Sequence, residues 1–267
     1  MLADNPIGIR NGCLSAGWRE AFALAKEAGA ECLELDVDAE YADFPLYSAA
    51  GRSELQKLAA QSGVKLVSIC LGAFWKLSPS NPDGAIRARA AKLLNETIAG
   101  CDAIGIPYIL APFTHHEGAT VESQRAGWGE VLGQVVPTAK QAKVKTGLEL
   151  CARDFAHSAG DAIAILTAAS APPNMGVYFD TANGMHRGHQ PEEEIPELAA
   201  AKRLTVVHIK DYRNCHLGEG SVNFPAVKRE LEKAQYRGPF VLETPGGDDP
   251  LASAKRNLDF TKRLFRG

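Results

Sequence analysis

The sequence predicts a single α/β domain over residues 1–267, folded as a (β/α)8 TIM barrel. Apolar, β-branched runs alternate with helical patterns from one end of the chain to the other. Eight such strand–helix pairs fit into 267 residues at about 33 residues per pair, which suits this barrel. No linker or shift in composition divides the chain.

The main rival is a doubly wound open sheet. Such a sheet usually has fewer strands and carries a glycine-rich phosphate-binding turn after the first one. Here the first predicted strand is followed by Asn11, Gly12 and Cys13, which do not form that turn. Right-handed strand–helix units repeated eight times instead close into a barrel.

Eight segments have the apolar, β-branched composition of strands that are buried on both faces. We expect strands at Ile7–Arg10, Cys32–Asp38, Lys65–Leu71, Tyr108–Phe113, Thr146–Cys151, Met175–Asp180, Leu204–Asp211 and Phe240–Thr244. Between them lie segments with apolar residues at helical spacing. We expect helices at Trp18–Ala28, Ser53–Ser62, Ala85–Ile104, Val121–Lys143, Asp161–Ala169, Pro191–Lys202, Phe224–Gln235 and about Pro250–Phe265.

Local signals mark the ends of two of these helices. Gly29 follows the first helix, at a position where glycine often ends a helix. Asp248 or Asp249 is placed to cap the last helix, and Pro250 suits its first position. Many barrels bind phosphate at this place, but two aspartates at the helix start favour capping, so we expect a non-phosphorylated substrate.

The composition excludes several classes of protein. With 45% hydrophobic residues, 23% charged residues and a net charge of −3, the chain resembles an ordinary globular protein. Its charges are scattered, without the basic stripe of a nucleic-acid binder. No apolar run approaches the ~20 residues that span a bilayer, and the N-terminus lacks a secretory signal. We therefore expect a cytoplasmic protein with no nucleic-acid or membrane partner.

The six cysteines occur singly. None of them has Cys-x-x-Cys or zinc-finger spacing. Cys32, Cys70 and Cys151 lie in apolar segments, and we expect buried free thiols there rather than metal ligands or disulfides.

Polar residues stand at the ends of four successive predicted strands. Asp180 closes the sixth strand, and Glu149, His208 and Glu243 lie near the ends of the fifth, seventh and eighth. They are 31, 28 and 35 residues apart, each one strand–helix unit. Because chemistry in a barrel sits at the C-terminal ends of its strands, we expect all four around one rim. A lone acid there would more often cap a helix, but four neighbouring strand ends favour a common site.

Three carboxylates that converge without a cation would repel one another and raise their pKa values. A divalent metal ion removes this repulsion, and His208 would be its single nitrogen donor. Oxygen-rich ligation with one imidazole suits Mn²⁺, which we expect, with Mg²⁺, Co²⁺ or Zn²⁺ as alternatives.

The four strand ends resemble those of the xylose-isomerase-like TIM-barrel superfamily, and most nearly its sugar (phosphate) isomerase/epimerase branch (AP endonuclease family 2). The matching segments are Leu148–Leu150, Phe179–Asn183, Val207–Asp211, Leu242–Thr244 and the glycine-bearing loop Leu217–Phe224. The resemblance implies that Glu149, Asp180, His208 and Glu243 are metal ligands and that the two glutamates also transfer protons. Barrels of the resembling branch pair through their outer helices, so a homo-oligomer is one expectation, and the sequence leaves the oligomeric state open.

The predicted residues suit proton transfer at a carbon beside a carbonyl. A metal that holds the carbonyl and hydroxyl oxygens stabilises the enediolate, and an acid and a base must reach the carbon. Glu149 and Glu243 come from strands three apart, so they can approach a sugar from different sides. Bases on opposite faces would epimerise the carbon, whereas one base serving adjacent carbons would interconvert an aldose and a ketose.

Substrate contacts are expected near these ligands. Epimerases of the resembling family carry a histidine three residues after the metal-binding aspartate and an arginine about six after the histidine ligand, where this chain has Asn183 and Asn214. Asn183 can still bind a hydroxyl, Arg213 lies one position away, and His186 can partly compensate. Lys210 shares the strand face of the histidine ligand, so we expect it to meet substrate or a carboxylate.

Other residues of the same rim have two readings each. Arg153, after the fifth strand, can hold an anionic group or cap the next helix. His115 or His116, after the fourth strand, can contact substrate or belong to a solvated loop. The segment Ala73–Lys76, which follows the third strand and carries Phe74 and Trp75, can cover sugar carbons as an aromatic lid, and Glu34 can face substrate or a buried network.

The main hypothesis is a divalent-metal-dependent isomerase or epimerase of a small sugar or keto-polyol. The alternative is a dehydratase or lyase that uses the same metal site on a keto-polyol or 3-keto-glycoside. A DNA-repair endonuclease of the related barrel family would need a three-zinc histidine cluster and a cationic face, which the sequence lacks. A non-catalytic sugar-binding barrel is disfavoured by the four predicted ligands.

Overall fold

Eight parallel strands close into a barrel in the computed structural model, which describes residues 2–151 and 155–267. The strands are β1 (Ile7–Arg10), β2 (Cys32–Asp36), β3 (Lys65–Cys70), β4 (Tyr108–Pro112), β5 (Lys145–Glu149), β6 (Met175–Asp180), β7 (Leu204–Ile209) and β8 (Phe240–Leu242). Each strand pairs in parallel with the next, and β1 pairs with β8 to complete the ring. The predicted (β/α)8 barrel is therefore confirmed.

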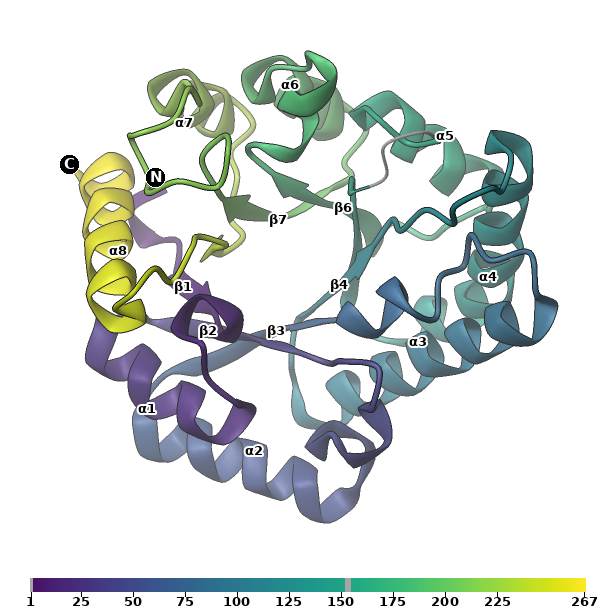
Figure 1. The fold of residues 1–267 in the computed structure, drawn as a ribbon, viewed down its shortest axis with the longest axis horizontal. Coiled ribbons are helices and arrows are strands. Elements are labelled where there is room, and N and C mark those ends of the chain that lie inside the picture. The colour runs from purple at the N-terminus through teal and green to yellow at the C-terminus, as the bar shows by residue number, and fades with distance from the viewer. Residues whose placement is uncertain (1, 152–154) are drawn as a thin grey trace.

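Helices surround the strands as an outer ring (Figure 1). They are α1 (Trp18–Ala28), α2 (Ala49–Ser62), α3 (Gly84–Ile104), α4 (Val121–Gln141), α5 (Ala159–Ala168), α6 (Pro191–Ala200), α7 (Phe224–Lys233) and α8 (Pro250–Arg266). The two predicted helix ends are confirmed. Gly29 ends α1 with a φ of 84°, which favours glycine, and the Asp249 side chain accepts a hydrogen bond from Ala252 N at the start of α8.

Six of the eight strands end earlier than predicted, whereas β1 and β6 end where expected. The ladder of β7 stops at Ile209 instead of Asp211, and that of β2 stops at Asp36 instead of Asp38. The residues beyond leave the ladder and bond elsewhere: Lys210 N donates to the Thr181 hydroxyl oxygen at 3.0 Å. The strand ends thus turn into the loops that build the rim.

The barrel interior has a separate apolar cluster that includes Cys32, Cys70, Tyr178, Val206 and Val241. Side chains alternate between the two faces of a strand. The interior residues of β6, β7 and β8 therefore lie two positions before the candidate ligands of the same strands, and those ligands point into the barrel above a packed floor.

Two further expectations can be compared with the fold. All six cysteines are free thiols; Cys32 and Cys70 are buried as predicted, but Cys151 is only half-buried because it lies beyond the end of β5. Among the described residues, no helix is both long and apolar enough to cross a bilayer.

Candidate metal centre

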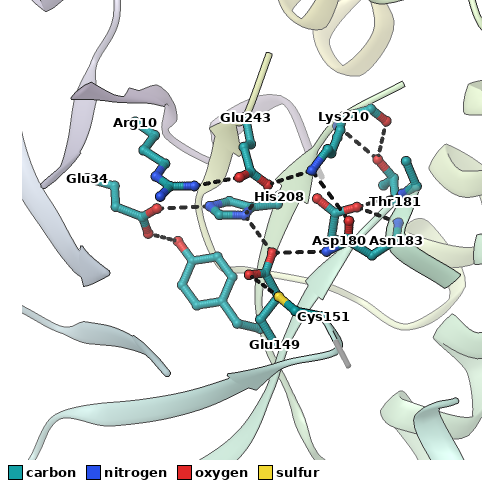
Figure 2. Close-up of polar contacts among 12 residues, drawn as sticks. Arg10, Glu34, Glu149, Cys151, Asp180, Thr181, Asn183, His208, Lys210 and Glu243 are labelled. Atoms are coloured by element: carbon teal, nitrogen blue, oxygen red, sulfur yellow. Dashed lines mark hydrogen bonds and ion pairs between the residues drawn. The ribbon is translucent and has the colours of Figure 1, made fainter. Parts of the chain in front are cut away.

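The four predicted ligands converge at the C-terminal end of the barrel (Figure 2). Glu149 and Asp180 are the last residues of β5 and β6, His208 is the last but one of β7, and Glu243 directly follows β8. Each offers one ligand atom, and these four atoms all lie within 4.8 Å of one another. The expectation that neighbouring strand ends would gather these side chains is confirmed.

His208 is fully buried between carboxylates. Its Nε2 atom lies 3.0 Å from Glu34 Oε1, and its Nδ1 atom lies 3.1 Å from Glu149 Oε1 and 3.5 Å from Glu243 Oε2. The hydroxyl of Tyr178 donates to Glu34 Oε2 at 2.6 Å. Glu34 therefore belongs to a buried network, one of the two expectations for it, and this network turns Nδ1 toward the other candidate ligands.

Asp180 has one occupied and one open oxygen. Its Oδ1 atom accepts hydrogen bonds from the backbone amides of Ala182 and Asn183, both at 2.7 Å. Its Oδ2 atom is buried and has no hydrogen-bond partner among residues 2–151 and 155–267. Burial is the main reason that the pKa of Asp180 is raised to about 7. A buried carboxylate oxygen of this kind requires a partner, and a metal ion would supply one.

The two glutamates have different neighbours (Figure 2). Glu149 accepts from the Cys151 thiol at 3.1 Å and from the Asn183 amide at 3.4 Å. Glu243 instead meets two cations: Arg10 Nη1 lies 2.5 Å from its Oε1 atom and Lys210 Nζ lies 3.2 Å from its Oε2 atom.

The charges of the metal-free site compensate one another. Burial acts to raise the pKa of Glu243, but hydrogen bonding to His208 and the charges of His208, Lys210 and Arg10 hold it well below its ordinary value. Burial acts to lower the pKa of His208, but the charge of Glu34 and hydrogen bonds to three carboxylates raise it well above its ordinary value. The His208 imidazole thus lies among acidic groups that favour its positively charged form.

The donor set fits a divalent metal ion. It comprises three carboxylates and one imidazole within a small space, and the open Asp180 oxygen is one of the four ligand atoms available. Carboxylate oxygens suit Mn²⁺ and Mg²⁺, and a single imidazole also admits Co²⁺ or Zn²⁺.

A cavity of about 260 Å³ borders the site and is lined by two of the four candidate ligands, Glu149 and Glu243. The side chains lining it include Arg10, Trp75, Glu149, Asn183, Lys210 and Glu243. Three of the predicted substrate contacts, Asn183, Lys210 and His186, lie along this cavity. Trp75 is 57% exposed, and it is the large apolar side chain that stands out as exposed among the described residues. An exposed aromatic ring at the mouth of a polar cavity is well placed to cover apolar faces of a small ligand.

Two predicted substrate contacts lie elsewhere. His115 is exposed in the loop after β4 and is not among the residues that line the cavity. Arg213 lines a different pocket, where its guanidinium stacks over the Tyr212 ring at 5.7 Å. The backbone explains this placement, since Arg213 and Asn214 both adopt positive φ, of 68° and 54°, in a tight turn. Arg153 falls outside the described residues.

Asp211 organises the loop that follows this turn. Its carboxylate accepts hydrogen bonds from four backbone amides, those of Tyr212, Gly218, Gly220 and Val222, at 2.8–3.1 Å. A Cβ atom added at Gly220 would lie 2.2 Å from Asp211 Oδ1, so only glycine allows this approach. The glycine-bearing loop noted in the sequence is therefore built around an internal carboxylate.

Arg10 and Asp36 are site residues that were not predicted. They close β1 and β2, of which β1 pairs with β8 in the barrel and β2 pairs with β1, and Arg10 joins Asp36 to Glu243. The strand-end rule that identified the four ligands also applies to these two strands. The opposite charges of Arg10 and Asp36, at the ends of two adjacent strands, could have indicated an ion pair at the rim.

The chain resembles known proteins over nearly its whole length. It is 26% identical to L-ribulose-5-phosphate 3-epimerase of Salmonella typhi, over 96% of this chain and 94% of that protein. Two solved structures at 18% identity share the fold, each over 97% of this chain and 99% of the other. They are D-psicose 3-epimerase with D-tagatose from Clostridium cellulolyticum H10, with a TM-score of 0.82, and 3-keto-D-glucoside 4-epimerase from E. coli, with a TM-score of 0.80. Residues 22–264 match the family model for the xylose isomerase-like TIM barrel, so the chain belongs to that family.

Proposed function

We propose that this protein is a sugar epimerase that depends on a divalent metal ion. The observation that carries the proposal is the convergence of Glu149, Asp180, His208 and Glu243 beside a polar cavity. The similar proteins support it, since their names give each of them an epimerase activity at carbon 3 or carbon 4 of a sugar. The metal would be held by these four residues, with Mn²⁺ as the expected ion and Mg²⁺, Co²⁺ or Zn²⁺ as alternatives.

Glu149 and Glu243 are the proposed acid and base. When bound, the metal ion would supply Lewis-acid stabilisation of negative charge on the substrate oxygens. One glutamate removes the proton from the carbon beside the carbonyl, leaving an enediolate, and the other returns a proton to the opposite face. The carbon is thereby inverted, and the two carboxyl groups exchange their protons with solvent between turnovers.

The other residues of the cavity would bind and orient the sugar. The Asn183 amide and the Lys210 ammonium group both lie beside the glutamates and can donate to substrate hydroxyls. Trp75 can cover the carbon face of the sugar and keep water out of the cavity. The substrate class we propose is a small ketose or keto-polyol, and a homo-oligomer remains a prediction.

Exchange of substrate protons with deuterated water tests the proposal. The metal-loaded protein is incubated with a panel of ketoses and keto-polyols, free and phosphorylated, and proton loss and epimer formation are followed by NMR. We expect exchange at the carbon that is inverted, with no change in substrate mass other than deuterium. Loss of water or of an aglycone would instead identify the dehydratase or lyase.

Two variants assign the roles. Glu149→Gln and Glu243→Gln keep the size of each side chain but remove its ability to accept a proton, so each should lower exchange by at least about 100-fold. Glu54→Gln, on the outer surface in an ion pair with Arg19, is the matched control and should leave exchange unchanged. Unchanged exchange in either active-site variant would contradict the assignment.

A further inference from the structure

Arg10 links two carboxylates across the seam between β1, β2 and β8. Its Nε atom donates to Asp36 Oδ2 at 2.7 Å and its Nη2 atom donates to Asp36 Oδ1 at 2.8 Å. Its Nη1 atom donates to Glu243 Oε1 at 2.5 Å. A planar guanidinium that is held at two points by one carboxylate has a fixed orientation, so the direction of Nη1 is fixed as well.

Asp36 is itself held in place. Its backbone amide donates to the Asn11 side chain at 2.8 Å, and the Asn11 amide group donates to Ala16 O, also at 2.8 Å. Asn11 is buried, at 8% exposure. The contacts thus run from the loop after β1 through Asn11 and Asp36 to Arg10, and all of these residues belong to a part of the barrel that supplies no candidate ligand.

These contacts make the two oxygens of Glu243 unequal (Figure 2). Oε1 is occupied by Arg10. Oε2 is turned toward the candidate metal centre, 3.5 Å from His208 Nδ1 and 3.2 Å from Lys210 Nζ. Rotating the carboxylate would break the contact with Arg10, whose own position is fixed by Asp36.

We propose that Arg10, braced by Asp36, is a positioning residue that sets the rotation of the Glu243 carboxylate and so presents Oε2 to the metal ion. This inference rests on the proposed metal-dependent function. Mutation of a residue that supports a metal ligand typically lowers metal affinity or activity by about 10–100-fold. Arg10 acts through Glu243 in the same way. Its positive charge also offsets the negative charge of Glu243, which is proposed both to bind the metal ion and to transfer a proton.

Metal affinity of the full chain is the primary measurement. Mn²⁺ binding is titrated by calorimetry for the wild type, Arg10→Gln, Arg10→Lys and Asp36→Asn, and turnover is measured on the same samples. We expect Arg10→Gln to bind Mn²⁺ about 10–100-fold more weakly and to lose kcat by a similar factor, with KM changed by less than about threefold. A residue that only supported the fold would not separate kcat from KM in this way.

The lysine variant separates geometry from charge. Lysine keeps the positive charge between the two carboxylates, so we expect the variant to fold. Its single ammonium group cannot hold both Asp36 oxygens and also reach Glu243. We expect Arg10→Lys to keep the thermal stability of the metal-free wild type yet to remain at least about tenfold weaker in Mn²⁺ affinity. It also carries the test if the glutamine variant does not fold.

Two more variants complete the design. Asp36→Asn should weaken Mn²⁺ binding in the same direction, and the double variant with Arg10→Gln should lose no more than Arg10→Gln alone, because the two residues act as one unit. Arg19→Gln, which removes an arginine from a comparable two-point pair with Glu54 on the outer helices, is the control and should bind Mn²⁺ like the wild type.

The outcomes distinguish this inference from the proposed function. A wild-type chain that binds no divalent metal overturns both. A wild-type chain that binds Mn²⁺, together with Arg10→Gln and Arg10→Lys variants of wild-type affinity and kcat, overturns the role of Arg10 alone. A loss in Arg19→Gln equal to that in Arg10→Gln also overturns it, because the effect would then not be specific to Glu243.

Discussion

The two halves of the barrel contribute differently to the site. Strands β5 to β8 carry all four candidate ligands, whereas β1 and β2 carry Arg10, Glu34 and Asp36, which contact those ligands. The first half holds side chains in place and the second half presents them to the cavity. A barrel allows this division because its closure brings residues far apart in sequence into contact, as with Arg10 and Glu243.

The supporting half reaches the ligands from two directions. Glu34 contacts the buried Nε2 atom of His208 from within the barrel, and Tyr178 holds the second oxygen of Glu34. Arg10 contacts Glu243 from the rim. A metal-binding imidazole needs its other nitrogen fixed, because that contact sets the orientation and tautomer of the ring. The difference between the halves therefore predicts graded effects on metal binding.

The largest effect is expected in the ligand-bearing half. Asp180→Asn keeps an oxygen for the amides of Ala182 and Asn183 but replaces the open oxygen by an amide nitrogen. We expect Mn²⁺ affinity to fall by more than about 100-fold, the upper end for supporting residues. Calorimetry and elemental analysis measure this loss. Asp161→Asn, another aspartate that accepts from backbone amides, is the control, and a wild-type metal content in Asp180→Asn would contradict the assignment.

An intermediate effect is expected in the supporting half. Glu34→Gln leaves the His208 ring with a neutral partner at Nε2, so the ring loses the charge that raises its basicity, and Mn²⁺ affinity should fall by about 10–100-fold. Tyr178→Phe removes one hydrogen bond to Glu34 and should cost less. Metal titrations rank the three proteins. A larger loss of Mn²⁺ affinity in Tyr178→Phe than in Glu34→Gln would contradict the prediction that Glu34 is the direct support of His208.

The smallest effect concerns pH. The pKa of Asp180 is about 7 in the folded metal-free chain, against an ordinary value of 3.8. Between these values the folded chain holds a proton that the unfolded chain has released, so the contribution of this group to stability falls as pH rises. The raised pKa of His208 acts with the same sign. A bound metal ion would compensate the carboxylate at high pH, so the metal should raise Tm by about 2–4 °C more at pH 8 than at pH 6. Equal metal-induced shifts in Tm at both pH values would contradict this.

Most of the fold followed from the sequence because strands and helices have different hydrophobic periods. Helix α1 and strands β1 and β6 have the predicted bounds. Helix α2 begins at Ala49, four residues before its predicted start at Ser53. Most strand errors lie at the C-terminal ends, where residues such as Lys210 exchange a backbone partner for a side-chain partner, Thr181. Hydrophobic pattern does not record that exchange, because the side chains on both sides of it remain partly or fully buried.

The candidate ligands that could be predicted lie in the second half of the barrel, and the site residues that were missed lie in the first half. The cluster of four candidate ligands could be predicted because polar residues interrupt apolar strands at regular spacing. Arg10 could not be recognised as easily, because one charged residue at the end of a four-residue strand has many ordinary explanations and its partner Glu243 is 233 residues away. The sequence could not decide whether His115 and Arg213 reach the site, because loop conformation, such as the positive φ of Arg213, is not set by strand periodicity.

The carboxylate of Asp211 has a consequence for which sugars can be held. In many barrels, a phosphate ester is cradled by backbone amides of the loops after the seventh and eighth strands. Here the loop after β7 already directs four of its amides to Asp211, and Asp249 accepts from the first turn of α8. Each place carries an anion of its own. A phosphorylated sugar would meet donors already engaged and a like charge beside them, so we predict that these two loops favour an uncharged sugar over a phosphorylated one.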